Sequence, residues 1–451
     1  MEQLLIIGNG FDLACHLGTS YNDFFKWRFE QLFGNTSKLD IKNKIRDLTK
    51  NFDRELYNPK SKNVKLENNL AECFGSQIDL STITVWDYIF LFGDDFFEET
   101  NGDVQWQDIE KMIYNVMTVA LDNNFDNNFD KKHLINHISS LNLNLTFKEE
   151  NKNNIKIQFY KYIKYFFIKR LGEPRKDTAY NALLSLNKFE NIFSQFILEE
   201  ERDKADYKKN AQKLLMKLYN SANIDFKNNT SNSPDICSVL SFNYTLRAID
   251  NLKIFVSGRE GHKFGIPCPW INIHGIVANE NDIDKYIRND KTHISPLNKP
   301  ENGIPTPIFG IDNHDILKDN KENDLRMIFT KSFRTIDSYV NNIWRGRFIL
   351  KRQIDVITIY GHSLGKADYS YFETIFDNSN LYDSRTCLQV YYYAEKNRPE
   401  KNLLEKRRIE SALINLLTDY GKTLSNGHGE NIVNKMVLEN RIEVIPTTSL
   451  N

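Results

Sequence analysis

Residues 4–14 read Leu4-Leu5-Ile6-Ile7-Gly8-Asn9-Gly10-Phe11-Asp12-Leu13-Ala14. Four apolar residues run directly into Gly-x-Gly, which is typical of a buried parallel strand that stops at a tight turn. Glycine lets the backbone fold sharply and approach a ligand closely. Open α/β sheets bind nucleotides at such a turn, after the first strand. The stretch therefore predicts a nucleotide site, with an ordinary turn as the alternative because the third glycine of a full dinucleotide motif is missing.

Charge and composition exclude several classes of protein. The 451 residues carry 59 Lys plus Arg against 60 Asp plus Glu, so the chain as a whole has no basic nucleic-acid footprint. Five scattered cysteines form no C-x-x-C pair, which fits reduced thiols and gives no zinc spacing. Residues 122–130 repeat Asp and Asn but lack the glycine and glutamate of a calcium loop, so we expect a solvated connector there and no metal.

The sequence shows neither the pattern of a signal peptide nor that of a membrane span. Residues 1–20 contain Glu2 and no basic start, so we expect no signal peptide. No stretch approaches 18 consecutive apolar residues, so we expect no membrane span. The sequence predicts a cytoplasmic protein.

Further strand-like segments return only after residue 235. They are residues 236–242, 270–273, 308–310, 354–360, 388–394 and 442–446. Strands that alternate with helices indicate a mostly parallel sheet. The predicted fold is therefore α/β and Rossmann-like, with its first strand far from the others in sequence.

The intervening region has helical periodicity. Ser20 is a plausible N-cap for a helix that begins at Tyr21, and residues 109–121 and 155–171 continue the pattern. In the last segment Phe159, Ile163, Phe166 and Phe167 share one helix face, so we expect them to pack in a core. The predicted domains are an α/β nucleotide-binding core, 1–25 plus 232–451, and a large helical insertion, 26–231, after the first strand–helix unit.

Polar residues follow three of the later predicted strands. They are Asn243, His274 and the loop from Gly361 to Asp368. Because parallel strands end at one edge, these residues would line one crevice with Gly8–Asp12. Each has a structural alternative: Asn243 as a turn residue, His274 as a buried and satisfied histidine, and Asp368 as the cap of a following helix.

Six motifs in this order resemble the AbiH family of bacterial phage abortive infection proteins. They are residues 8–14, Thr19-Ser20-Tyr21-Asn22-Asp23-Phe24, Trp106-x-Asp108-Ile109-Glu110, Ser241-Phe242-Asn243-Tyr244-Thr245, Ile273-His274-Gly275 and Gly361-His362-Ser363-Leu364-Gly365-Lys366-Ala367-Asp368. The resemblance implies a role in phage defence, in which an infected cell is shut down before the phage spreads.

A more distant resemblance implies a chemistry. Gly-x-Gly, Asn-Tyr, His-Gly and Gly-x-Ser-x(4)-Asp are similar to SIR2-type NAD-consuming domains. By that resemblance Asn243 and His274 are the predicted catalytic residues. The predicted binding residues for NAD, as substrate, are Gly8, Asn9, Gly10, Phe11, Asp12, Phe242, Tyr244, Gly361, Ser363 and Asp368. Thr245 stands where that family has Asp, and Asp12 where it has Ser. The sirtuin zinc cysteines are absent, so deacylation is not implied.

The implied reaction is chemically simple. Nicotinamide leaves NAD as a neutral ring and needs no general acid. An Asn amide can position water and the ribose hydroxyls, and a His with a pKa near 6.5 can accept the proton. The predicted function is a phage-defence effector that hydrolyses NAD or a related nucleotide at the N-glycosidic bond. Its predicted partners are the nucleotide, a phage-derived trigger and further copies of the chain, but not a membrane or nucleic acid.

Two other functions compete with this one. Gly361-His362-Ser363-Leu364-Gly365 matches the nucleophile elbow of a serine esterase, with His428 as the sole downstream histidine. A non-catalytic nucleotide sensor or interaction protein is the second alternative. The basic residues in Trp344-Arg345-Gly346-Arg347 and Lys351-Arg352 are more typical of a solvated face than of a local nucleic-acid site.

Overall fold

The computed structural model describes most of the chain. The described residues are 2–50, 82–93, 106–122, 131–141, 143, 152–171, 176–221, 236–246, 253–257, 263–267, 269–277, 307–313, 316, 324–337, 350, 354–425 and 427–448. They form two compact units. Unit 1 comprises residues 1–20, 197–308 and 335–451, and unit 2 comprises residues 21–196 and 309–334.

Unit 1 is built on a six-stranded sheet in which every neighbouring pair is parallel. Its spatial order is β5-β2-β1-β6-β7-β8. Renumbered along the chain, this order is 3-2-1-4-5-6, that of doubly wound dinucleotide-binding folds. The strands are β1 (Glu2–Ile7), β2 (Ile236–Ser241), β5 (Trp270–Asn272), β6 (Val356–Tyr360), β7 (Cys387–Ala394) and β8 (Ile442–Thr448). The α/β fold predicted from the sequence is confirmed.

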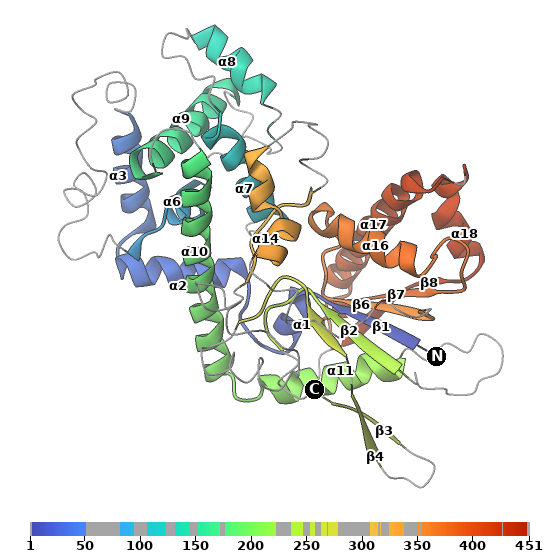
Figure 1. The fold of residues 1–451 in the computed structure, drawn as a ribbon. Helices are drawn as coiled ribbons and strands as arrows, with labels where there is room; N and C mark the ends of the chain where they lie inside the picture. Colours follow the sequence, from blue (N-terminus) through green and yellow to red (C-terminus); the bar gives the residue numbers. More distant parts are fainter. Residues whose placement is uncertain are drawn as a thin grey trace. The chain divides into compact units, whose positions relative to one another are not determined.

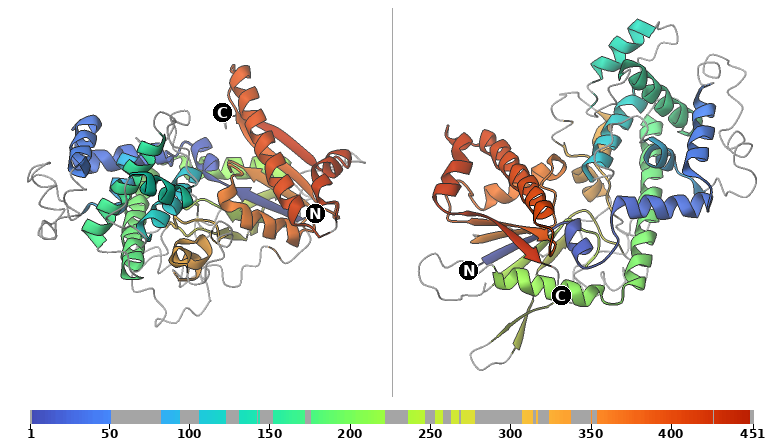
Figure 2. Two further views of the ribbon diagram at one scale, coloured as in Figure 1. Left: turned by 90° about the horizontal axis from the view of Figure 1, so that it is seen from above. Right: turned by 180° about the vertical axis from the view of Figure 1, so that it is seen from behind.

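Helices cover both faces of this sheet (Figure 1). On one face α11 (Tyr207–Ser221) packs against alternate residues of β1 and β2, including Leu5 and Val239. On the other face Leu4 and Ile6 belong to one apolar cluster with residues of α16 (Tyr369–Asn378) and α17 (Pro399–Thr423), and α17 packs on β7 and β8. The right-hand view in Figure 2 shows the same layers from behind. Strands buried on both faces explain the nearly continuous apolar runs in the sequence.

The remaining described elements of unit 1 are short. The helix α1 (Asn9–Ala14) follows β1, and β3 (Lys253–Ser257) pairs antiparallel with β4 (Lys263–Pro267). Three further helices, η7 (Lys366–Asp368), η8 (Gly429–Asn431) and α18 (Ile432–Leu438), lie in the C-terminal half.

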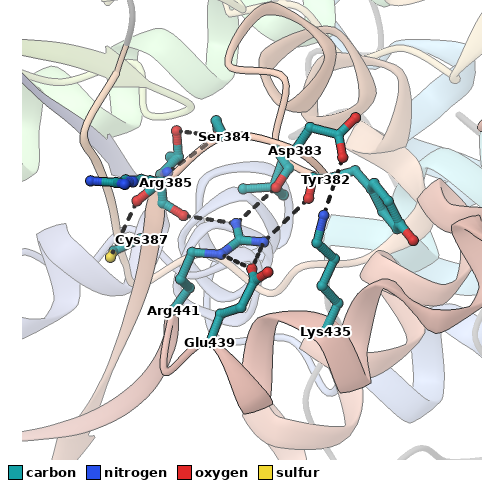
Figure 3. Close-up of polar contacts among 10 residues, drawn as sticks. Tyr382, Asp383, Ser384, Arg385, Cys387, Lys435, Glu439 and Arg441 are labelled. Atoms are coloured by element: carbon teal, nitrogen blue, oxygen red, sulfur yellow. Dashed lines mark hydrogen bonds and ion pairs between the residues drawn. The ribbon is translucent and has the colours of Figure 1, made fainter.

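A buried arginine fixes the C-terminal edge strand (Figure 3). Arg441 precedes β8 and donates from Nη1 to the carbonyl oxygens of Leu381 at 2.8 Å and Thr386 at 3.2 Å. Its Nε donates to Glu439 at 2.7 Å. One guanidinium therefore ties the α16–β7 connection to the start of β8, using its rigid fork of donors.

Unit 2 is helical. Its elements are α2 (Tyr21–Phe33), α3 (Lys38–Lys50), α6 (Val85–Phe92), α7 (Trp106–Ala120), α8 (Lys131–Ser140), α9 (Lys152–Leu171), most of α10 (Lys176–Asp203), η6 (Leu325–Phe329) and α14 (Lys331–Asp337), whose last residues fall in unit 1. Aromatic rings fill its core, with Phe24 edge-on to Phe193 at a centroid distance of 5.0 Å. The predicted large helical insertion is therefore present. The predicted domain limits, 1–25 plus 232–451 and 26–231, stay a prediction, although α11 belongs to unit 1 and residues 309–334 to unit 2.

Buried ion pairs hold the later segment of unit 2 in place. Arg334 is bonded to Glu190 on α10, with one Nη2–Oε2 distance of 2.7 Å. Lys331 pairs with Glu110 of the Trp106–Glu110 motif. Glu110 therefore has a structural partner within its own unit.

Two sequence expectations about local structure are wrong. Ile308–Gly310 forms no regular strand, and only an isolated bridge joins Ile311 to Thr330. Asp122 is not part of a solvated connector. Asp122 is buried, and its Oδ2 accepts a hydrogen bond from the Tyr160 hydroxyl at 2.7 Å. The same oxygen lies 2.6 Å from Nε2 of His137. The rest of that repeat, residues 123–130, lies outside the described residues.

Candidate functional site

The loop after β1 packs directly on the loop after β6. Gly10 N–H donates to the carbonyl oxygen of Gly361 at 2.9 Å, and Gly8 N–H donates to Tyr360 at 3.0 Å. A Cβ on Gly8 or Gly10 would come within 2.7 Å of the Gly361–His362 backbone. Glycine is therefore required at both positions because the backbone of the loop after β6 lies so close to them. The Gly10 N–H is committed to that contact rather than directed at a ligand.

The other residues of the first turn also have protein partners. Asn9 donates to the Thr19 carbonyl at 3.2 Å and accepts from the Thr19 hydroxyl at 2.6 Å. Phe11 is buried, edge-on to Tyr360 at 6.0 Å between ring centroids. Both side chains hold the turn in place.

Asp12 is the centre of a buried polar cluster on the α11 side of the sheet. Its two carboxylate oxygens accept from the hydroxyls of Tyr207 and Thr245, each at 2.6 Å. Burial raises the pKa of Asp12 to about 7, although both hydrogen bonds favour the charged form. The carboxyl therefore ties α1 to α11 and to the loop after β2.

Asn243 lies in the same region. Its side-chain Nδ2 donates to the carbonyl oxygen of Gly8 at 3.0 Å, and its own carbonyl accepts from Asn272 at 2.9 Å. The amide is thus beside the Gly8–Gly10 turn. Tyr244, the next residue, donates from its hydroxyl to the carbonyl of Ile308 at 3.4 Å.

His274, His362 and Asp368 form a second cluster, which we call the His–Asp–His cluster. The Asp368 Oδ2 lies 3.2 Å from His362 Nε2, and its Oδ1 lies 3.6 Å from His274 Nε2. Both histidine side chains are about 5% exposed, and that of Asp368 is 15% exposed. Although Asp368 occupies the N-cap position of α16, its side chain makes no capping hydrogen bond. The carboxylate is oriented toward the histidines instead.

Aromatic rings surround this cluster. Phe242, which follows β2, is edge-on to His274 at 5.4 Å and to His362 at 4.4 Å, and stacks on Phe372. Tyr371 of α16 lies 5.3 Å from the His274 ring. Such apolar surroundings strengthen the interaction of the histidines with the carboxylate.

The Gly361–Gly365 loop does not have the arrangement of a nucleophile elbow. Ser363 Oγ accepts from Gly365 N–H at 3.4 Å, and among the described residues it has no hydrogen bond to a histidine. The positive φ angles fall on Gly361 and Leu364 rather than on the serine. His428 lies before η8, where its carbonyl accepts from the Tyr382 hydroxyl.

Three further sequence expectations concern metals, nucleic acid and a membrane span. The described residues contain no group of three His, Cys, Asp or Glu side chains suited to a metal ion. The basic residues 344–347 and 351–352 lie outside the described residues. Across the described ranges, no helix has the length and apolar character needed to cross a membrane.

Sequence reasoning missed three residues of these clusters. His362 lies inside the Gly361–Asp368 motif, directly after the glycine that ends a predicted strand, and this position is the signal that could have identified it. Tyr207 and Tyr371 lie on helices with ordinary amphipathic patterns, so only the fold brings them to Asp12 and His274.

The sheet order and the polar residues after β2, β5 and β6 define a Rossmann-like α/β protein with an added helical unit. The sequence model of one family, described as "Bacteriophage abortive infection AbiH", matches residues 4–391. The chain belongs to this family, as its six motifs predicted. No curated protein and no solved structure matches the chain. The likeness to SIR2-type domains stays a prediction.

Proposed function

We propose that this AbiH-family protein is an abortive-infection effector that hydrolyses the N-ribosyl bond of NAD or a related nucleotide. The observation that carries the proposal is the His–Asp–His cluster at the C-terminal edge of a 3-2-1-4-5-6 sheet. Ligands of such sheets bind outside the carboxyl ends of the strands, near the reversal of strand order. A histidine paired with a carboxylate there is suited to accept a proton from water.

The proposed reaction balances without a cofactor. Water attacks C1′ of the ribose, the C1′–N bond breaks, and its electron pair neutralises the pyridinium ring of the departing nicotinamide. The proton released by water passes to His274, whose imidazolium Asp368 stabilises at 3.6 Å. Losing such a positioned group costs about a hundredfold to ten-thousandfold in rate.

The first turn suits a structural role better than phosphate binding. The Gly10 N–H donates to Gly361, and Phe11 N–H donates to Gly8. Asn243 donates to the Gly8 carbonyl, so we assign it to holding the turn against the site rather than to the water. The proposal therefore centres on the ribosyl bond, and NAD is the member of the substrate class to test first.

The test is release of nicotinamide from NAD by purified protein, measured by chromatography. We expect His274→Ala and Asp368→Asn to abolish the release without lowering the melting temperature. Lys366→Ala is the matched control, because Lys366 lies on the same loop with its side chain 90% exposed. Hydrolysis that persists in both cluster variants would refute the proposed role of His274.

A non-catalytic nucleotide sensor or interaction protein is the second candidate, because the histidines of the cluster are buried. Tight nucleotide binding without turnover would favour it. For either function, we propose that the helical unit keeps the protein silent before infection or mediates self-association. Sedimentation of the full chain with and without NAD tests self-association. A phage-derived trigger stays a prediction.

A further inference from the structure

The loop after β6 fixes the hydrogen bonding of His362 at both ring nitrogens. Leu364 N–H donates to Nδ1 at 2.9 Å. Because a backbone N–H can only donate, Nδ1 must be unprotonated. In the neutral ring Nε2 then carries the proton, and it donates to Asp368 Oδ2 at 3.2 Å. The fold therefore selects one tautomer of His362.

This arrangement leaves His362 without a free acceptor. The ring could take up a proton at Nδ1 only by losing the Leu364 bond, which restrains a leucine with φ of +56°. A non-glycine residue in this region is strained and persists only where its surroundings hold it. His362 is thus poorly placed to be a general base.

The two carboxylate oxygens of Asp368 are divided between the two histidines. Oδ2 faces His362 and Oδ1 faces His274. The Asp368 side chain is more exposed than that of either histidine. Asp368 stands at the N-cap position of α16, but its side chain makes no capping hydrogen bond. The Nε2–H of His362 is therefore a contact that turns this carboxylate inward, away from water.

We propose that His362 is a positioning residue, which anchors one oxygen of Asp368 so that the other faces His274. Its catalytic consequence rests on the proposed function, but the geometry does not. Partners that orient the ligand side chains of metal sites typically contribute about tenfold to a hundredfold, and we expect an effect of that size from His362.

Two substitutions separate the two hydrogen bonds of His362. The Asn side-chain oxygen is bonded to Cγ, as Nδ1 is in His, so His362→Asn retains an acceptor for Leu364 and loses the reach to Asp368. The Gln amide nitrogen is one bond farther out, as Nε2 is, so His362→Gln retains a donor to Asp368. Both variants have a polar side chain at position 362, and they differ in which of the two hydrogen bonds of His362 is retained.

The first measurement needs no substrate. In protein labelled with ¹⁵N-histidine, long-range ¹H–¹⁵N spectra at pH 8 should show His362 protonated at Nε2 only. The ring signals of His274 should move in His362→Asn and stay near their wild-type positions in His362→Gln. Protonation of His362 at Nδ1, or an equal response of His274 to both variants, would overturn the proposal.

The second measurement uses NAD as the probe. We expect the kcat for nicotinamide release to fall tenfold to a hundredfold in His362→Asn, with KM little changed, and to stay within about threefold in His362→Gln. Equal loss in two variants that melt like the wild type would contradict the positioning role. If the wild-type protein does not hydrolyse NAD, the proposed function fails, and the spectra alone decide the role of His362.

Discussion

Gly361→Ala should destabilise unit 1 more than an alanine at a similar backbone angle elsewhere in the same unit. Gly361 has a φ of +68°, and its added Cβ would lie 2.4 Å from the backbone nitrogen of Phe11 and 2.6 Å from the carbonyl carbon of Gly10. Both neighbours are backbone atoms, so no side-chain rotation can relieve the overlap. The two loops must separate.

The magnitude has two parts. A left-handed backbone angle costs an L-residue about 1–2 kcal/mol, and overpacking that shifts backbone typically costs about 1–3 kcal/mol. Gly361→Ala should incur both. Gly427 has a φ of +69° and no atom within 4 Å of its added Cβ, so Gly427→Ala should incur only the first. The difference between the two variants is the cost of the loop contact.

The assay is thermal unfolding of the full chain, followed by near-UV circular dichroism. For a unit of roughly 250 residues, 1 kcal/mol corresponds to about 2–4 °C in Tm. We therefore expect Gly361→Ala to melt about 2–12 °C below Gly427→Ala. Equal melting temperatures would refute the reasoning, because they would show that the loops do not need glycine at their contact.

Three other predictions follow from buried groups and from the elbow motif. The pKa of Asp12 rises from 3.8 to about 7 on folding, so its contribution of about 4 kcal/mol to stability is complete below pH 4 and is lost as pH rises through 7. Urea midpoints should therefore fall between about pH 4 and 7, and this fall should be smaller in Asp12→Asn. Ser363→Ala should leave nicotinamide release unchanged, and a fluorophosphonate probe should not label the wild-type serine. Arg334→Met should cost about 3–5 kcal/mol by leaving Glu190 buried and unpaired, and Arg334→Met combined with Glu190→Leu should recover part of that loss in thermal unfolding.

The strands could be predicted where apolar runs end in glycine or in polar residues, as β1 and β6 do. The expected strand at Ile308–Gly310 does not form, and the cause is a set of contacts with residues outside the segment, which a local sequence pattern cannot show. Phe309 N–H donates to the Glu190 carboxylate, and the Phe309 carbonyl accepts from Arg334 at 2.7 Å. Two charged side chains, one far away in sequence, satisfy this backbone in place of a neighbouring strand.

The Gly-x-Gly turn shows why the candidate site was harder to predict than the fold. A ligand and a second loop impose the same requirement on a glycine, which is the absence of a Cβ, so the local pattern cannot tell which of them approaches. Here the approaching group is Gly361, about 350 residues away in sequence, and it takes the Gly10 N–H. That contact holds the loop after β6 against β1. The same loop carries His362 and Asp368. The glycine motif therefore contributes to the proposed chemistry by fixing the position of this loop, and not by binding a phosphate of the ligand.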